Sequence, residues 1–330
     1  MKRSSGVHIA GRRQFLKQGA AGLALAGAGL DRAVAQDKTT VILGTATPGG
    51  GFPVWGDAYA AALNEADPTL RIETRNTKGS AENIPLLEQG KLDIGLVQGE
   101  AAHAAYAGIG RAPLTLNILV AMYSSPGMFV VRADSPYRRI ADLKGQAVAF
   151  GAAGSGLVIL SRYVLDGIGL NQDSDFKAVY LERAGDGPAM VKDGRVAALW
   201  GGGLGWPGFT NMMSDPAGAR FIAPTEEEIG AIRAKHNFLK RLTIPAGSYP
   251  NQPQDLVSVG SWSFVLARPG LPDELAYRLT RSLHKSEARL GERLAQARES
   301  RVANLYGAAP RPEMIHPGAL RYLKEIGAAK

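Results

Sequence analysis

The sequence predicts an α/β fold of two lobes with a ligand-binding cleft between them. Short apolar, β-rich runs alternate with segments of helical spacing, which is typical of parallel sheets covered by helices on both faces. In this chain of 330 residues the alternation falls into two groups, roughly residues 37–130 and 134–245. One unusually long extended run, Leu116–Arg132, lies where the two groups meet. We therefore expect two lobes joined by hinge strands.

In the first group we expect strands at Val41–Thr47, Arg71–Thr77 and Ile94–Gln98, and helices at Trp55–Asn64 and Ala81–Glu88. In the second group we expect strands at Ala147–Gly151, Ala178–Leu181, Val196–Trp200 and Phe221–Ala223, and helices at Leu157–Leu165 and Ala184–Val191. A further strand-like run, Leu256–Arg268, precedes a long predicted helix, Asp273–Leu290.

We expect the chain to cross between the lobes twice. The run Leu116–Arg132 contains Ser124-Ser125-Pro126-Gly127, and a strand interrupted in this way can leave one sheet and enter another. A return crossing is expected near Ile244–Tyr249. The expected division is a leader at 1–35, a first lobe at 36–130, a second lobe at 131–245, and a return to the first lobe with C-terminal helices at 246–330.

The first 35 residues have the layout of an export signal. The twin-arginine run Gly11-Arg12-Arg13-Gln14-Phe15-Leu16-Lys17 is followed by an apolar stretch, Gly19–Leu30, and by a small-residue cleavage site, Ala33-Val34-Ala35. The apolar stretch is too short to span a bilayer as a helix. We expect twin-arginine export, cleavage after Ala35 and a periplasmic mature protein; an uncleaved anchor or a surface helix is the alternative.

Composition argues against several classes of function. The leader accounts for +5 of the formal net charge of +8, so the net charge does not indicate nucleic-acid binding. The chain has no cysteine, which excludes disulfides, iron–sulfur clusters and thiol nucleophiles. The four histidines after the leader lack the spacing of a zinc site: His103, His236, His284 and His316. No cofactor, metal or nucleic-acid partner is expected, and the protein is expected to be a monomer.

Two candidate binding loops follow predicted strands of the first group. The loop from Gly44 to Pro53 contains Gly50, Gly51 and Phe52, and glycines there permit close backbone approach to a ligand. The second loop, after Arg71–Thr77, begins a predicted helix and supplies Ser80 and Asn83 as candidates. Gln98, which ends a predicted strand, and Tyr123, just before the hinge, are also candidates. An ordinary turn and simple helix capping are the alternatives.

Two more candidate loops lie in the second group. Gly154, Ser155 and Gly156 begin a predicted helix, where a hydroxyl and successive N–H groups suit a carboxylate or phosphate. Trp200 and Gly201 begin a glycine-rich loop that ends at Gly208 and suits the apolar body of a small ligand; core packing of the Trp is the alternative. The G-x-G-x-x-G match within it lacks the immediate helix of a dinucleotide site.

Catalytic motifs are weak in this chain. Ser155 lacks the G-x-S-x-G frame of a nucleophile elbow because Gly154 directly precedes it. A triad assembled from Ser155 and a distant histidine has no local support. We therefore expect a binding protein and not an enzyme.

Seven blocks along the mature chain occur in a characteristic order. They are Gly44–Pro53, Thr77–Asn83 with Leu86–Gln98, Val131–Ser135, Asp142–Gly145, Gly154–Gly156, Ile244–Pro250 and Ile315–Ala319. In this order the blocks resemble the TAXI family of solute receptors for TRAP transporters. The resemblance implies a two-lobed type II periplasmic binding protein fold that captures a small organic acid or an amino-acid-like carboxylate and delivers it to a TRAP permease.

Two stretches depart from that family's pattern. Phe52-Pro53-Val54-Trp55 stands where the family often has tyrosines, and the Trp200–Gly208 loop is richer in glycine. The ligand can therefore differ from the glutamate or 2-oxoglutarate that the resemblance suggests. A receptor for an ABC transporter or a sensor is the main alternative, and an exported hydrolase that uses Ser155 is a second.

Overall fold

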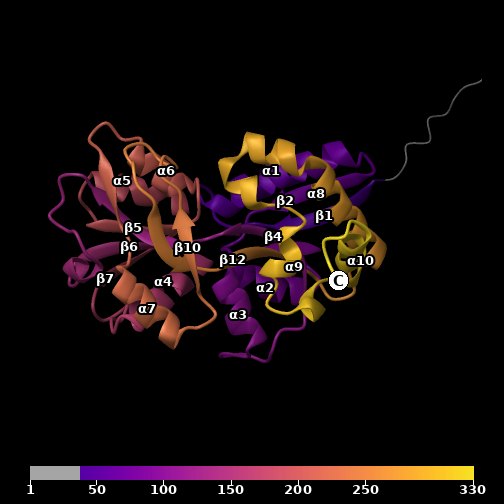
Figure 1. Ribbon diagram of the computed structural model, residues 1–330, viewed down its shortest axis with the longest axis horizontal. Helices are drawn as coiled ribbons and strands as arrows, with labels where there is room; N and C mark the ends of the chain where they lie inside the picture. The colour runs from indigo at the N-terminus through magenta and orange to yellow at the C-terminus, as the bar shows by residue number, and fades with distance from the viewer. Residues whose placement is uncertain (1–37) are drawn as a thin grey trace, which may run out of the picture. The chain divides into compact units, whose positions relative to one another are not determined.

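Two five-stranded mixed sheets organise the chain, and the computed structural model describes residues 38–330 (Figure 1). The leader predicted at 1–35 lies outside the described residues. The first sheet has the order β2 (Leu70–Arg75), β1 (Thr39–Gly44), β3 (Ile94–Val97), β12 (Trp262–Ala267), β4 (Asn117–Ser124). The second sheet has the order β7 (Lys177–Leu181), β6 (Ala147–Ala152), β8 (Ala198–Gly202), β5 (Gly127–Arg132), β9 (Ala219–Ile222).

The two sheets share one plan. In each, four strands run in the same direction, and the one strand that arrives from the other lobe lies antiparallel to its two neighbours: β12 in the first sheet and β5 in the second. We call the first sheet with its helices the first lobe (residues 38–124 and 262–330), and the second sheet with its helices the second lobe (residues 127–260). The α/β, two-lobed prediction is thus confirmed.

Helices cover both faces of each sheet. In the first lobe these are α1 (Gly51–Ala66) and α8 (Asp273–Arg293), which pack together, and α2 (Ser80–Glu88), α3 (Gly99–Tyr106), α9 (Asn304–Ala308) and α10 (Pro317–Glu325). In the second lobe they are α4 (Gly156–Gly167), α5 (Gly187–Lys192), α6 (Pro207–Met213) and α7 (Glu226–Lys235). Short 3-10 turns occupy Ile140–Leu143, Ala184–Asp186, Ala295–Glu299 and Pro312–Met314.

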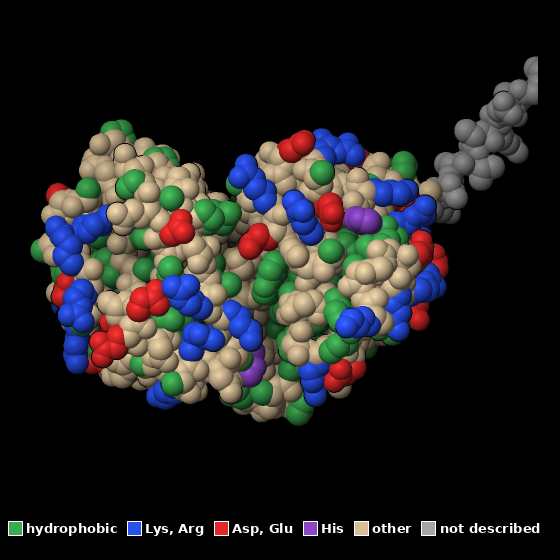
Figure 2. All heavy atoms as spheres, in the orientation of Figure 1, with side chains coloured by type: hydrophobic (Ala, Val, Ile, Leu, Met, Phe, Trp, Pro, Cys, Tyr) green, Lys and Arg blue, Asp and Glu red, His purple; other side chains and the backbone are tan. Residues whose placement is uncertain are grey.

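Each lobe has its own hydrophobic core. One cluster of buried apolar side chains contains Val41, Leu43 and Leu266, and a second contains Phe129, Val148 and Trp200. The central strands β3 and β8 are buried along their whole length, as expected for strands covered by helices on both faces. On the face shown in Figure 2, acidic and basic side chains lie intermixed over both lobes.

The first predicted crossing is confirmed. The extended run divides at Ser125-Pro126, so that β4 belongs to the first sheet and β5 to the second. The return crossing predicted near Ile244–Tyr249 is wrong. Ile244 and Tyr249 pack in the core of the second lobe, and β10 (Lys240–Ile244) pairs with β11 (Leu256–Gly260) in a separate two-stranded ribbon. The chain reaches the first sheet only after Ser261, where β12 begins.

Candidate functional site

A cavity lies at the carboxyl ends of strands from both lobes. Its wall includes residues that follow β1, β2, β3 and β4 in the first lobe, and residues at the ends of β6 and β8 in the second. The space within it is about 560 Å³, part of it open to solvent. Parallel strands bring their carboxyl ends to one edge of a sheet, and ligands of open α/β proteins bind at that edge.

Four helices of eight or more residues begin at this cavity. The wall contains Gly50 and Gly51 at the start of α1, Ser80 at the start of α2, Gln98 at the start of α3, and Ser155 at the start of α4. Each helix start brings first-turn backbone N–H groups and the positive end of a helix dipole to the cavity. Two of these N–H groups are already paired, since Ala81 donates to the Gly154 carbonyl and Leu157 to the Ser155 hydroxyl. The four starts together make the cavity favourable for a negatively charged group.

The starts of α2, α3 and α4 touch one another. The Ser80 hydroxyl accepts a hydrogen bond of 3.0 Å from the backbone N–H of Gln98. A Cβ atom added to Gly156 would lie 2.3 Å from the Cβ of Gln98 and 3.0 Å from the Ser80 hydroxyl. Gly156 is therefore required for this close approach between the lobes. The Ser155 hydroxyl caps α4 by accepting a 3.1 Å hydrogen bond from the Leu157 amide.

Gln98 is a buried amide residue of the cavity wall. Its side chain is 4% exposed, and its Nε2 has no hydrogen-bond partner. A buried amide nitrogen without a partner costs about 1–3 kcal/mol. A ligand oxygen that reaches Nε2 would remove that cost.

The remaining wall is mainly apolar. The rings of Phe52 and Tyr123 meet edge to face with centroids 6.5 Å apart, and Leu157 and Trp206 line the same space. Burial raises the pKa of the Tyr123 phenol well above its ordinary value, so the phenol stays neutral. Among the described residues that line the cavity, Lys78 is the only one with a formal charge.

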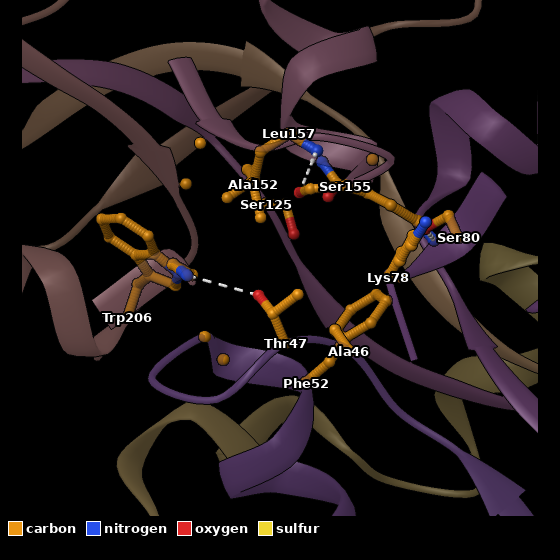
Figure 3. Close-up of a pocket in the computed structure, with 18 of the residues that line it drawn as sticks. Ala46, Thr47, Phe52, Lys78, Ser80, Ser125, Ala152, Ser155, Leu157 and Trp206 are labelled. Carbon is orange, nitrogen blue, oxygen red and sulfur yellow. Dashed lines mark hydrogen bonds between the residues drawn. The ribbon is translucent and has the colours of Figure 1, made fainter. Parts of the chain in front are cut away.

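The two lobes touch on both sides of the cavity. On one side the amide of Ala81 donates to the carbonyl of Gly154 at 3.2 Å. On the other, the amide of Ala184 donates to the Thr47 hydroxyl at 3.3 Å, and the amide of Gly185 donates to the Pro48 carbonyl at 3.4 Å. In Figure 3 the Trp206 ring lies on the side of the cavity where the Thr47 hydroxyl accepts the hydrogen bond from Ala184, across the cavity from Ser80 and Ser155.

Eight of the twelve predicted site residues lie in the cavity wall: Gly50, Gly51, Phe52, Ser80, Gln98, Tyr123, Ser155 and Gly156. The other four predicted residues, Asn83, Gly154, Trp200 and Gly201, lie outside it. Asn83 is fully buried and donates to the carbonyls of Thr45 and Leu96, each at 2.8 Å.

Packing explains why the other three lie outside. Gly154 faces the Lys78 backbone, where an added Cβ would come within 3.3 Å of the Lys78 carbonyl. Trp200 is fully buried in the second core and donates from Nε1 to the Leu157 carbonyl at 2.9 Å. An added Cβ on Gly201 would meet the Trp206 ring. Trp200 and Gly201 thus pack against the wall residues Leu157 and Trp206 without lining the cavity themselves.

The structure adds cavity residues that the sequence did not single out: Ala46, Thr47, Lys78, Gly79, Ser125, Gly151, Ala152, Leu157, Ala184, Gly202 and Trp206. Most of them flank a predicted residue in the same loops. Trp206 lies in the glycine-rich loop that Trp200 begins, and strand register decides which of the two tryptophans reaches the cavity. Ala184 was expected to begin a helix and instead begins a 3-10 turn.

A buried acid lies near the cavity. Glu100 is fully buried in α3 and accepts a 2.7 Å hydrogen bond from the Ser261 hydroxyl, at the point where β11 gives way to β12. Its Oε2 has no partner. Burial raises the pKa of this carboxyl to about 7. Glu100 is not among the residues that line the cavity.

Comparison with solved structures places this arrangement in a known fold. A protein described as a periplasmic transporter shares 14% identity, with 87% of this chain and 92% of that chain covered and a TM-score of 0.53. An ancestral arginine-binding protein bound to arginine shares 15% identity, with coverage of 78% and 99% and a TM-score of 0.51. At such identities the likeness concerns the fold alone.

The two sheets, the double crossing and the cavity between the lobes define a type II periplasmic binding protein fold. Within this fold, a sequence profile of the NMT1-like family matches residues 43–327, and the chain belongs to that family. In the part of the chain that the structure describes, no helix is long and apolar enough to cross a membrane.

Proposed function

We propose that this protein is a solute-binding protein that captures a small organic anion. The observation that carries the proposal is the meeting of four helix starts at one cavity whose described wall contains no acidic side chain. Each helix end is equivalent to about half a positive charge. A carboxylate or sulfonate placed there would gain charge-assisted hydrogen bonds from backbone N–H groups and from Gln98.

Binding is coupled to closure of the two lobes in this proposal. The hydrogen bonds from Ala81 to Gly154 and from Ala184 to Thr47 join the lobes on either side of the cavity. A ligand that contacts both walls favours the closed arrangement because it gains those contacts only there. The closed form is the one that a membrane transporter would recognise.

The finer proposal is that the solute is delivered to a TRAP permease in the periplasm after twin-arginine export. The ordered loop motifs, with their likeness to TAXI receptors, and the leader motif support it. A receptor for an ABC transporter would use the same cavity and the same closure. Identifying the permease encoded beside this gene separates the two, because TRAP permeases have large multi-span subunits and ABC transporters have ATPases.

Hydrolysis by Ser155 is less well supported. Its hydroxyl accepts the hydrogen bond that caps α4, and the described cavity wall contains no His, Asp or Glu to act as a general base. Binding of an anion, in contrast to hydrolysis, requires no general base and only the hydrogen-bond donors that the wall contains.

The test uses the mature protein with a panel of monocarboxylates, dicarboxylates, sulfonates and amino acids. A true ligand must raise the melting temperature, since it binds the native state only. Titration calorimetry then gives the affinity, and small-angle scattering should show a smaller radius of gyration with ligand. If no organic anion raises the melting temperature, or if a labelled ester is turned over, the proposal is wrong.

A further inference from the structure

Gln296 is a buried amide residue beside the cavity. It lies in the 3-10 turn that follows α8, it is 1% exposed, and neither Nε2 nor Oε1 has a hydrogen-bond partner among the described residues. Buried amide groups are normally paired, because water no longer reaches them. Gln296 therefore holds one donor and one acceptor at a position where the described part of the chain supplies no partner for either.

The Gln296 amide lies where the cavity wall passes from one lobe to the other. A Cβ atom added to Gly51, at the start of α1, would lie 2.7 Å from Gln296 Nε2 and 3.1 Å from Trp206 Cδ1. Gly51 belongs to the first lobe and Trp206 to the second, and both line the cavity. An added Cβ on Gly203, also in the second lobe, would lie 3.6 Å from Nε2. The second lobe thus covers an amide that belongs to the first.

The turn that carries Gln296 is fixed to the first lobe. Ser300, the residue after the turn, accepts a 2.9 Å hydrogen bond from Nε1 of Trp55 in α1. The Ser300 hydroxyl also donates a 2.6 Å hydrogen bond to the carbonyl of Met122 in β4. When the lobes part, Gln296 therefore stays beside α1 while Trp206 moves away with the second lobe. A solute that enters between open lobes reaches the amide before closure buries it.

The formal charge of the cavity lies on the opposite side. Figure 3 shows Lys78 beside Ser80, across the cavity from Trp206. Lys78 carries the only formal charge among the described residues of the wall, and the starts of α2, α3 and α4 meet at Ser80. We therefore expect the negative group of the ligand there. Near Gln296 the wall supplies neutral groups that form hydrogen bonds, the Trp206 indole N–H and the Tyr123 hydroxyl.

A group that pairs with both atoms of the Gln296 amide must donate one hydrogen bond and accept another. A hydroxyl or a carboxamide does this, whichever way the amide is turned. A carboxylate only accepts, so it would leave Oε1 unpaired beside a negative charge. An alkyl group would leave both atoms unpaired. The amide therefore favours a neutral polar group of the ligand on this side of the cavity.

We propose that Gln296 binds a hydroxyl or carboxamide of the ligand, and that the ligand is an organic anion with such a group remote from its charge. This inference rests on the proposed function and narrows it to one substrate class. It also links recognition to closure, because closing over a ligand that lacks this group buries the two amide atoms unpaired.

The first experiment compares acids of matched shape by titration calorimetry of the mature protein. Glutaramate ends in a carboxamide, and 5-hydroxyhexanoate carries a hydroxyl on a chain of the same length. Three analogues lack a group that both donates and accepts: 5-oxohexanoate, 5-methylhexanoate and glutarate. The shorter series is succinamate and 4-hydroxypentanoate against 4-oxopentanoate, 4-methylpentanoate and succinate. In one of the two series, the carboxamide or the hydroxy acid should bind at least tenfold more tightly than all three analogues.

The outcomes of this comparison separate the two proposals. If an analogue binds as tightly as the carboxamide and the hydroxy acid in both series, this inference is wrong and anion capture stands. If no organic anion binds, in these series or in the wider panel, the proposed function itself fails.

A pair of glutamine variants tests the residue with whichever anion binds best. Gln296→Met removes both unpaired polar atoms at similar length, so the free protein should melt at the same temperature or higher. Its affinity should fall at least tenfold, and the preference for a hydroxyl or carboxamide should disappear. Gln172→Met is the control, because Gln172 is also buried, lies outside the wall and donates from Nε2 to the Tyr180 hydroxyl at 2.9 Å. The control should lose stability and keep its affinity. Unchanged affinity of Gln296→Met would leave the amide a structural role only and overturn this inference.

Discussion

The amide of Ser125 donates a 2.9 Å hydrogen bond to the carbonyl of Ser261, and this bond joins the two places where the chain passes between the lobes. The hydroxyls of Ser125 and Ser263 also lie 3.4 Å apart, and the Ser258 hydroxyl donates to the carbonyl of Gly127. The two crossings therefore lie side by side and are hydrogen-bonded to each other. Lobe movement should bend both crossings together, because separate bending of either one would break these bonds.

Ser155→Ala tests whether the start of α4 belongs to the binding site. Loss of the cap should cost about 1 kcal/mol of stability, and affinity for the best anion should fall about tenfold. Thr225→Ala is the matched control, because Thr225 caps α7 by accepting a hydrogen bond from the Glu228 amide and is not part of the cavity wall. It should lose similar stability and no affinity. Equal affinities of the two variants would place the anion elsewhere.

Gly185→Val tests closure. A Cβ on Gly185 would lie 3.2 Å from the Cα of Gly49 in the other lobe, so a branched side chain should hold the lobes apart. We expect normal folding, at least tenfold weaker binding, and no ligand-induced decrease in the radius of gyration. Gly230→Val on α7, where an added Cβ meets nothing within 4 Å, should bind and compact normally. Tight binding by the Gly185 variant would mean that closure is not coupled to binding.

Glu100 should make stability depend on pH. Its pKa is about 7 in the folded protein and about 4.5 in the unfolded chain, so the unfolded state binds fewer protons between these values. The free energy of unfolding should therefore fall as pH rises from about 4.5 to 7 and then level off, by an amount on the order of 3 kcal/mol. Urea unfolding of Glu100→Gln should lack this decline, and its stability advantage over the native sequence should be largest near pH 8. Parallel pH profiles for the two proteins would contradict the assignment.

The leader yields a prediction that is independent of the cavity. Mass spectrometry of periplasmic protein should show an N-terminus at Gln36 or its cyclised form. Replacing Arg12 and Arg13 by Lys should retain precursor in the cytoplasm. Normal export of that variant would indicate the general secretory route.

Much of the fold could be predicted because local patterns of apolar residues mark the strands and helices, and breaks in those patterns mark where they end. The Ser-Ser-Pro-Gly interruption within Leu116–Arg132 marks the first crossing correctly, since proline cannot continue strand pairing. The second crossing carries no such mark. Leu256–Arg268 reads as one strand-like run, and its division at Ser261 depends on pairing of β11 with β10, a contact that the local pattern does not reveal.

Part of the cavity wall could also be predicted from local sequence. Glycine-rich loops after parallel strands must lie at one edge of the sheet, which brought Gly50, Ser80 and Ser155 into one wall. The choice between Trp200 and Trp206 depended on the register of β8, where Trp200 points into the core. Lys78 could not be distinguished from other loop lysines, because its importance comes from the absence of other formal charges in the described wall.

At the four helix starts the backbone attracts the ligand's anionic group, whereas side chains shape the space for the rest of the ligand. These two parts of recognition can therefore evolve separately. A peptide dipole has no proton to lose and no side chain to mutate, so attraction for an anion is inherited with the backbone itself. Substitutions at Phe52, Leu157 or Trp206 would reshape only the space for the ligand's body. Proteins that keep these helix starts can therefore change their ligand specificity through a few side-chain substitutions, without an intermediate that no longer binds anions.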